Sequence, residues 1–238
     1  MSKLGDKLHL MRAWRFASLA VWVGLTVPAS AGAQGNQDVD RAVAAIRVAA
    51  TAGDQVAQFS LGAMLYYGTP DTAQAIEWFR KAAAQQYAPA EFQLGQIYDF
   101  GFGVGQDDRE ALVWYRKAAE HDSAAAQRSV GDFYQKGRGV VADAAEAARW
   151  YTRGADGDDI RAQYQLGQMY LTGTGVMRDY ASAYMWFSIA AGQAPLLDNR
   201  KELIELRNVA AARMTPQETA AAARRVAAWK PSAARSRS

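Results

Sequence analysis

The sequence contains no cysteine and only two histidines among its 238 residues, and these shortages exclude several classes of protein. Without cysteine the chain cannot form disulfides, a thiolate nucleophile, a zinc ribbon or an iron–sulfur cluster. His9 lies in a segment with the features of an export signal, which leaves His121 as the one imidazole for acid–base chemistry in the remainder. A histidine-rich metal site is therefore excluded, whereas 50% hydrophobic and 21% charged residues are typical of a folded protein.

Residues 1–33 have the order of features found in a secretory signal. Four basic side chains precede an uncharged, mostly apolar core at 17–27, and a proline then interrupts it. Small-x-small cleavage patterns follow at 29–31 and 31–33, and Met11 begins a more compact version of the same signal. The core is too short to span a bilayer, which takes about 20 apolar residues. We expect a cleaved signal peptide, a periplasmic or secreted protein and no stable membrane span after cleavage; the alternative is an uncleaved anchor.

The charge of the chain depends on this leader. The whole sequence has a net charge of +3, but residues 1–33 carry four basic side chains and one acidic side chain, so the rest holds 23 of each. Within that rest, residues 224–238 have five basic and no acidic side chains, while residues 34–223 carry a net charge of −5. A body of negative net charge argues against a nucleic-acid partner.

A tryptophan recurs every 36 residues, and each copy is followed directly by a phenylalanine or tyrosine. A second anchor, Leu-Gly or Val-Gly, places its glycine 19 residues before the tryptophan in three copies and 16 before it in the first. The length difference falls where the three long copies have Gly-x-Gly-Val, so this segment is a loop between two fixed elements. The anchors are Trp78, Trp114, Trp150 and Trp186, with Gly62, Gly95, Gly131 and Gly167.

Both elements of each repeat have helical spacing. Apolar or small residues recur at −5, −1, +2 and +3 from each glycine, and the glycine is expected to let the partner helix approach closely. The second helix begins after an aspartate that lies seven residues before the tryptophan. Three copies have Glu or Gln three residues after that aspartate, which predicts an N-cap with a reciprocal capping box. The aspartates are Asp71, Asp107, Asp143 and Asp179.

The segments on either side of the repeats are predicted to cap the array. A helix without the aromatic anchors is expected before the first repeat, and two helices are expected after the last, at about 197–213 and from Thr215 to about Trp229. The predicted organisation is a signal peptide at 1–33, a capping helix at 34–53, four repeats in 54–191 (about 54–86, 87–122, 123–158 and 159–194), capping helices at 195–229, and a disordered basic tail at 230–238.

The repeat unit combines Ala-x-x-x-Leu-Gly-x-x-Tyr, Gly-x-Gly-Val, Asp and Trp-aromatic-Arg-Lys-Ala-Ala, and it resembles the SEL-one-like repeat, a longer-looped relative of the tetratricopeptide repeat. The resemblance covers about residues 38–191. The third copy departs most, with Arg128 in place of an aromatic residue and Val130 in place of leucine. The resemblance implies an all-α, right-handed α/α superhelical solenoid, a bacterial exported member, and a protein-binding or assembly role.

Three patterns that suggest chemistry have structural explanations. The sequence Gly-Phe-Gly-Val-Gly at 101–105 is like a phosphate loop, but equivalent glycines recur in the next two copies without a preceding strand or a following Gly-Lys-Ser. The tryptophan–aromatic pairs are expected to be core because their spacing is fixed. His121 lies at a helix junction and is expected to be a solvated linker residue. We therefore predict no catalytic residue, no cofactor and no metal site.

Two classes of function remain open. We expect a scaffold or adaptor without enzymatic activity, which binds a protein or a component of the cell envelope. The alternative is a weak β-lactam-binding or cell-wall-active enzyme, because some cysteine-rich members of the SEL-one-like repeat family are described in this way. The serine chemistry of that class uses Ser-x-x-Lys, and no such motif occurs after residue 33.

The candidate binding surface is the variable stripe of the first helices. Positions −3, +1, +4 and +5 from each glycine share one face and differ between copies, whereas the constant positions serve packing. In the related tetratricopeptide repeats the matching face lines the concave groove. The candidate partner-binding residues are Phe59, Tyr66, Tyr67, Phe92, Gln96, Asp99, Phe100, Arg128, Asp132, Gln135, Lys136, Tyr164 and Gln168.

Overall fold

Every element of the repeats is an α-helix. The computed structural model describes residues 33–68, 72–193 and 200–231, which contain eleven helices and no strand. Apart from Ala33, the predicted signal lies outside the described residues, and so does the predicted tail from residue 232. Among the described helices, none combines the length and the apolar character needed to cross a bilayer. The helices are α2 (Ala33–Thr51), α3 (Gln55–Gly68), α4 (Thr72–Ala83), α5 (Ala88–Phe100), α6 (Asp108–Glu120), α7 (Ala124–Lys136), α8 (Ala144–Asp156), α9 (Ile160–Thr172), α10 (Tyr180–Gln193), α11 (Arg200–Ala211) and α12 (Pro216–Ala228).

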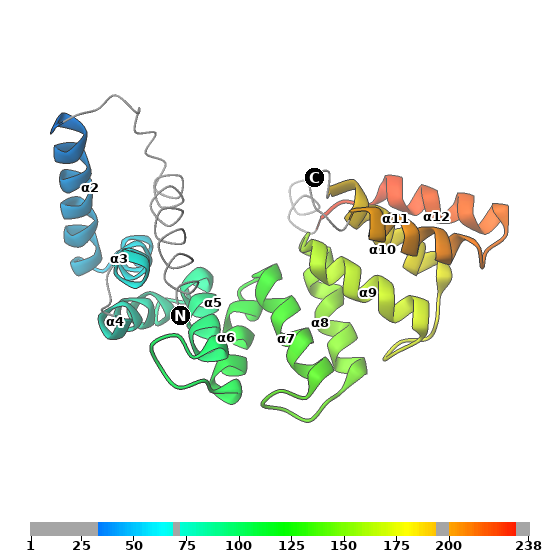
Figure 1. Ribbon diagram of the computed structural model, residues 1–238, viewed down its shortest axis with the longest axis horizontal. Coiled ribbons are helices and arrows are strands. Elements are labelled where there is room, and N and C mark those ends of the chain that lie inside the picture. The colour runs from blue at the N-terminus through cyan, green and yellow to red at the C-terminus, as the bar shows by residue number, and fades with distance from the viewer. Residues whose placement is uncertain (1–32, 69–71, 194–199, 232–238) are drawn as a thin grey trace, which may run out of the picture.

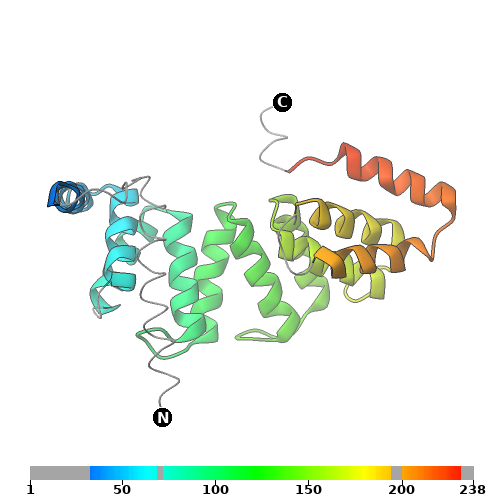
Figure 2. The same ribbon diagram turned by 45° about the horizontal axis from the view of Figure 1, so that its top comes forward.

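The helices follow one another along an arc that begins at α2 and ends at α11 and α12 (Figure 1). A tilted view shows the same succession (Figure 2). Within each repeat the first helix packs on the second, as α3 on α4 and α5 on α6, and each second helix also packs on the first helix of the next repeat. The chain is therefore an all-α helical repeat solenoid, in which each repeat depends mainly on its neighbours.

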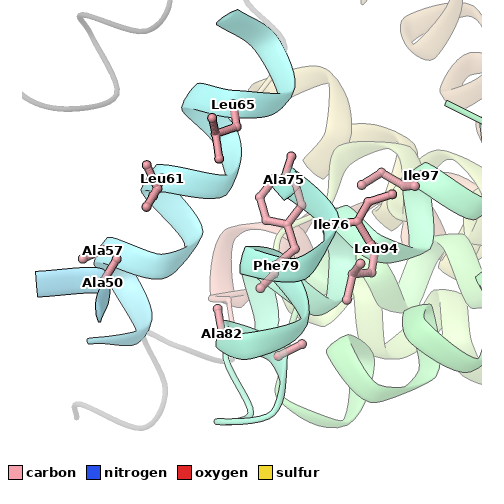
Figure 3. Packing of buried hydrophobic residues seen from close by; sticks show 12 residues of the cluster. Ala50, Ala57, Leu61, Leu65, Ala75, Ile76, Phe79, Ala82, Leu94 and Ile97 are labelled. Atoms are coloured by element: carbon pink, nitrogen blue, oxygen red, sulfur yellow. The ribbon is translucent and has the colours of Figure 1, made fainter. Parts of the chain in front are cut away.

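The aromatic residue after each tryptophan is the centre of its repeat's core. In Figure 3, Phe79 of α4 lies between Leu61 of α3 and Leu94 of α5, so its ring joins the first two repeats. Burying such a ring is a large part of what holds a repeat together, since apolar side chains dominate the favourable free energy of folding. The four residues, each at most 2% exposed, are Phe79, Tyr115, Tyr151 and Phe187.

The first three tryptophans lie at the edge of the core, which corrects for those repeats the prediction that both members of each pair are core residues; in the fourth repeat the prediction is confirmed. Neighbouring residues on a helix point about 100° apart, so the second aromatic takes the centre. The last tryptophan, Trp186, is only 6% exposed, and Trp229, the C-cap residue of α12, packs against it with ring centroids 6.2 Å apart. The first three are half-buried, and each has a cation over its ring: Lys81 at 4.0 Å from the centroid of Trp78, Lys117 at 4.1 Å from Trp114, and Arg153 at 4.6 Å from Trp150.

The anchor glycines allow the buried rings to approach the first helices, as predicted. A Cβ atom on Gly95 would lie 2.5 Å from Cδ1 of Tyr115, and one on Gly131 would lie 2.7 Å from Cδ1 of Tyr151. Carbon atoms in good contact are about 3.5–4.0 Å apart, so no larger residue fits without moving the ring. Gly62 and Gly167 meet Phe79 and Phe187 in the same way.

Aspartate N-caps begin the described second helices, but in the second and third repeats the predicted reciprocal capping boxes do not form. Asp107 Oδ1 accepts hydrogen bonds from the backbone N–H groups of Arg109 and Glu110 at 2.9 and 3.0 Å. The Glu110 side chain does not reach back to the cap, because it accepts a hydrogen bond from the indole N–H of Trp114 at 2.8 Å. Asp71 lies outside the described residues. The other caps of this kind are Asp143 and Asp179, and a full capping box occurs at Thr215 and Glu218.

The Gly-x-Gly loops are structural, as predicted. Their first glycine ends the first helix in the left-handed conformation, as at Gly137 with φ of 68°. Their second glycine lies against the start of the preceding repeat's second helix: a Cβ atom on Gly139, whose φ is 64°, would lie 2.6 Å from the carbonyl oxygen of Asp108. Only glycine satisfies both the positive φ and the close approach.

Candidate functional site

The predicted stripe on the first helices divides into residues that are bonded within the fold and residues that line a hollow. Nine of the thirteen predicted residues are half-buried, and two of these serve the core. The ring of Phe59 packs 5.6 Å from that of Phe79, and the ring of Phe92 packs 5.5 Å from that of Tyr115. The four exposed residues are Tyr67, Phe100, Gln135 and Lys136.

Asp99 connects the second repeat to the third. Arg138 Nη2 donates to Asp99 Oδ1 at 2.6 Å, and the hydroxyl of Tyr115 donates to Asp99 Oδ2 at 3.0 Å. Arg138 Nε also donates to Asp108 Oδ2 at 3.1 Å, and this hydrogen bond holds the pKa of Asp108 below its ordinary value of 3.8. Burial, and then the Asp99 carboxylate, raises the pKa of Tyr115, so its hydroxyl stays protonated as a donor.

The third repeat holds its variable residues in a similar network. The Tyr151 hydroxyl lies 2.7 Å from Asp132 Oδ1 and 2.8 Å from Gln135 Oε1. Arg128 Nη1 donates to Asp132 Oδ2 at 2.9 Å, and its Nε lies 3.5 Å from Asp159 Oδ1. Burial, and then the Asp132 carboxylate, raises the pKa of Tyr151. A partner that bound these side chains would have to compete with bonds that already join α7 to α8 and α9.

In the fourth repeat the predicted residues are tied to the C-terminal cap. The Tyr164 hydroxyl donates to Glu202 Oε1 of α11 at 2.7 Å, and the amide of Gln168 donates to Tyr164. Burial, followed by the hydrogen bond to Glu202, raises the pKa of Tyr164. These two residues therefore fix α11 against the array.

The hydrogen bonds between the buried tyrosines and the variable stripe have a sequence signal that the sequence reasoning did not use. In repeats two and three the buried ring is a tyrosine, and position +4 from the anchor glycine is Asp99 or Gln135. In repeats one and four the ring is a phenylalanine, and position +4 is Tyr66 or Leu171. Since a buried hydroxyl needs an acceptor, a polar residue at +4 accompanies the tyrosine for a structural reason.

A hollow of about 360 Å³ opens between α3 and α5, beside the loop that follows α5. It gathers four residues of the predicted stripe, and it adds four that the sequence reasoning missed, because they lie off the stripe or in segments read only as connectors. Three of its rings are well exposed: Tyr67 is 38% exposed, Phe100 58% and Phe102 57%. The predicted lining residues are Tyr66, Tyr67, Gln96 and Phe100, and the additional ones are Thr72, Gln93, Phe102 and Gly103.

A second, more open hollow of about 790 Å³ lies at the loop edge, between residues 106–109 and residues 137–141. Its two acidic side chains already have structural roles, since Asp107 caps α6 and Asp108 is paired with Arg138. Within the described ranges, no three or more His, Asp or Glu side chains are grouped so that they could hold a metal ion.

His121 lies in the exposed turn after α6, as predicted, but its ring is also bonded within the fold. Its Nδ1 lies 2.7 Å from Oε2 of Glu91, a carboxylate that is 2% exposed. The equivalent pair in the first repeat is Gln85 and Gln58, whose side-chain amides are hydrogen-bonded at 2.9 Å. In both repeats the pair joins the first helix to the end of the second, so His121 serves the packing within repeat two.

Comparisons with known proteins agree with this architecture. A family model of the Sel1 repeat matches residues 55–87, 88–123, 124–159 and 160–194. Among solved structures, a Sel1 repeat protein from Oxalobacter formigenes is 32% identical, with a TM-score of 0.64 over 69% of this chain and 48% of that one. A protective antigen present in uropathogenic Escherichia coli strains, which displays an SLR fold, is 25% identical, with a TM-score of 0.50 over 90% of this chain and 52% of that one. The chain thus spans about half the length of each. No functionally curated protein matches it.

Proposed function

This chain belongs to the Sel1 repeat family, and from that premise we propose that it is an exported scaffold that binds another protein through the hollow on its first helices. Proteins with Sel1 repeats generally act as protein-interaction scaffolds. The observation that carries the proposal is the exposure of Tyr67, Phe100 and Phe102 around one hollow. Exposed aromatic side chains that gather in one place are typical of binding sites, because their burial supplies much of the affinity of protein interfaces.

Export to the periplasm is the second part of the proposal. It is supported by the basic lead, the short apolar core and the small-x-small patterns within residues 1–33. Cell fractionation with N-terminal sequencing tests it, and we expect a periplasmic protein that begins at Gly32 or Gln34. Recovery of the exported protein with Trp22 still attached would contradict cleavage.

A non-catalytic role is supported by the bonding of the titratable groups with shifted pKa values. Asp108 and Arg138 pair with each other, Tyr115 donates to Asp99, and Tyr151 donates to Asp132. The shift at Asp108 comes from a contact between two repeats, and the pKa values of the two tyrosines are raised first by burial and then by a carboxylate of the same repeat. The competing function is β-lactam binding or activity on the cell wall, and incubation of the purified protein with a β-lactam and with cell-wall material tests it.

Affinity capture from an envelope extract tests the scaffold function. We expect the wild-type chain to retain a protein that a Tyr67→Ala, Phe100→Ala variant loses. The matched control replaces two exposed apolar residues of the other loops, Val141→Ala and Met177→Ala, which are 85% and 88% exposed and line no part of this hollow. Equal capture by both variants would show that the hollow is not the binding surface.

A further inference from the structure

The hollow between α3 and α5 differs chemically from the rest of the first-helix surface. Among the described residues, three large aromatic side chains are exposed, and all three line this hollow. They come from three places in the chain: Tyr67 from the end of α3, Phe100 from the end of α5, and Phe102 from the loop that follows. The fold therefore brings Tyr67 together with two rings that lie more than 30 residues further along the chain.

The rings around the hollow form ridges and not a flat platform. Tyr66 and Tyr67 are nearly perpendicular, with an interplanar angle of 86° and centroids 5.0 Å apart. Phe100 and Phe102 lie on the other side with centroids 5.6 Å apart and an angle of 30°. A ligand with its own alternating ridges fits between two such pairs better than a flat ring does.

The polar groups of the hollow are neutral. None of its lining residues carries a charge, and the polar side chains among them are hydroxyls and the amides of Gln93 and Gln96. The carbonyl oxygen of the Gln93 side chain is already 3.4 Å from the Tyr67 hydroxyl, which leaves the amide hydrogens of Gln93 as donors. The hollow therefore favours a neutral ligand that is rich in hydrogen-bond acceptors.

We propose that this hollow binds a proline-rich segment of the partner in the polyproline II conformation, an inference that rests on the proposed scaffold function. Such a segment has three residues per turn, no internal hydrogen bonds and a fully solvated backbone. Its carbonyl oxygens can accept from the glutamine amides, while its proline rings pack against the faces of Tyr67 and Phe100. Aromatic-lined grooves bind proline-rich segments in this way because the preformed helix loses little entropy on binding.

Other ligand conformations match the hollow less well. A helical segment bonds its own backbone groups and has no use for the glutamine donors. An added strand needs an exposed sheet edge, and the described part of the chain contains no strand. A neutral sugar has many hydroxyl donors, and the lining offers amide and hydroxyl oxygens but no carboxylate to accept from them, so a sugar is the competing ligand that the test includes.

Titration calorimetry of the full chain with a peptide of ten prolines tests the proposal. We expect saturable binding that Phe100→Ala weakens by at least about tenfold, because truncation of a central aromatic anchor removes much of the binding free energy. Tyr67→Phe keeps the ring and should bind nearly as well as the wild type. Val141→Ala is the matched control, since its side chain is exposed in the loop of the next repeat. Equal melting midpoints verify that the variants fold.

Three results would overturn the inference. Absence of binding to the proline peptide is one, and binding that Phe100→Ala leaves unchanged is another, because the peptide would then sit elsewhere. Binding of chitotetraose in place of the peptide is the third, since it would make the hollow a sugar site. The capture experiment tests the scaffold function separately. If the Tyr67→Ala, Phe100→Ala variant loses the captured protein but the proline peptide does not bind, the scaffold function is supported and only the proline-rich ligand is refuted.

Discussion

Replacement of Gly95 by alanine should destabilise the second repeat, although alanine is the better helix former. The added Cβ would lie 2.5 Å from Cδ1, 2.6 Å from Cε1 and 3.0 Å from Cγ of Tyr115. The ring cannot retreat easily, because it is 2% exposed, bonded to Asp99, and packed between Phe92 and Phe133 at 5.5 and 5.6 Å. Three close contacts against a ring held on three sides place the cost near the upper end of the range for overpacking, about 2–3 kcal/mol.

The gain in helix propensity offsets part of that cost. Glycine to alanine in a helix interior is worth about 1 kcal/mol, which leaves a net loss of about 1–2 kcal/mol. For a chain of this size 1 kcal/mol corresponds to about 2–4 °C, so the melting midpoint should fall by roughly 2–8 °C. Thermal and urea unfolding followed by circular dichroism measure it. The matched control is Gly192→Ala in α10, where a Cβ meets no atom within 4 Å, and we expect an unchanged or higher midpoint.

A double-mutant cycle with Tyr115→Ala separates the clash from other effects. Tyr115→Ala alone should cost about 3–5 kcal/mol. Once the ring is gone, Gly95→Ala should be neutral or stabilising, so the two changes should be strongly non-additive. Additive effects, or a Gly95→Ala midpoint that rises as in the control, would refute the argument that this glycine exists to seat the ring.

Three further results are expected. Tyr151→Phe should lose about 0.5–1.5 kcal/mol in urea unfolding, because the buried hydroxyl no longer donates; no change would mean that its bonds contribute nothing to stability. Trp186→Ala should lower the melting midpoint more than Trp150→Ala, because Trp186 is 6% exposed and Trp150 is half-buried, and the reverse order would contradict the packing described above. The Arg138 hydrogen bond lowers the pKa of Asp108, so the free energy that it adds to folding is fully present above the unfolded pKa near 3.8 and is lost as the pH falls below that value. In Arg138→Met the loss of stability between neutral and acidic pH should therefore be smaller than in the wild type.

The repeat and its packing could be predicted because the sequence contains four versions of one structure. Features that recur in every copy, such as the anchor glycines and the aspartates before the second helices, have the same contacts in each version that the structure describes. Repetition thus separates structural positions from accidental ones. It does not say which of two adjacent aromatic residues is central, because both recur with the same period. The cation three residues after Trp78, Trp114 and Trp150 was the available clue, since a charged group over a ring requires an accessible face.

The proposed binding surface was harder to predict, because variation between copies has two causes. A position can vary because a partner is recognised there, or because an internal contact varies with it. Asp99 and Gln135 belong to the second kind, since each accepts a hydrogen bond from the tyrosine of its own repeat. Tyr67 and Phe100, which lie in the hollow with exposed rings, have no such role in the core.

The Gly-x-Gly loops show how one motif can serve either an internal contact or a partner. Their glycines are fixed, because the first ends a helix and the second touches the start of the preceding repeat's second helix, as Gly103 touches Thr72. The residue between the two glycines is free to differ. In the third repeat it is Arg138, which reaches Asp99 and Asp108 and strengthens the joint between repeats. In the second repeat it is Phe102, which is 57% exposed and completes the aromatic hollow. Because the glycines hold the loop in place whatever stands between them, a single substitution at this position can exchange a contact between repeats for an exposed ring in the proposed binding surface.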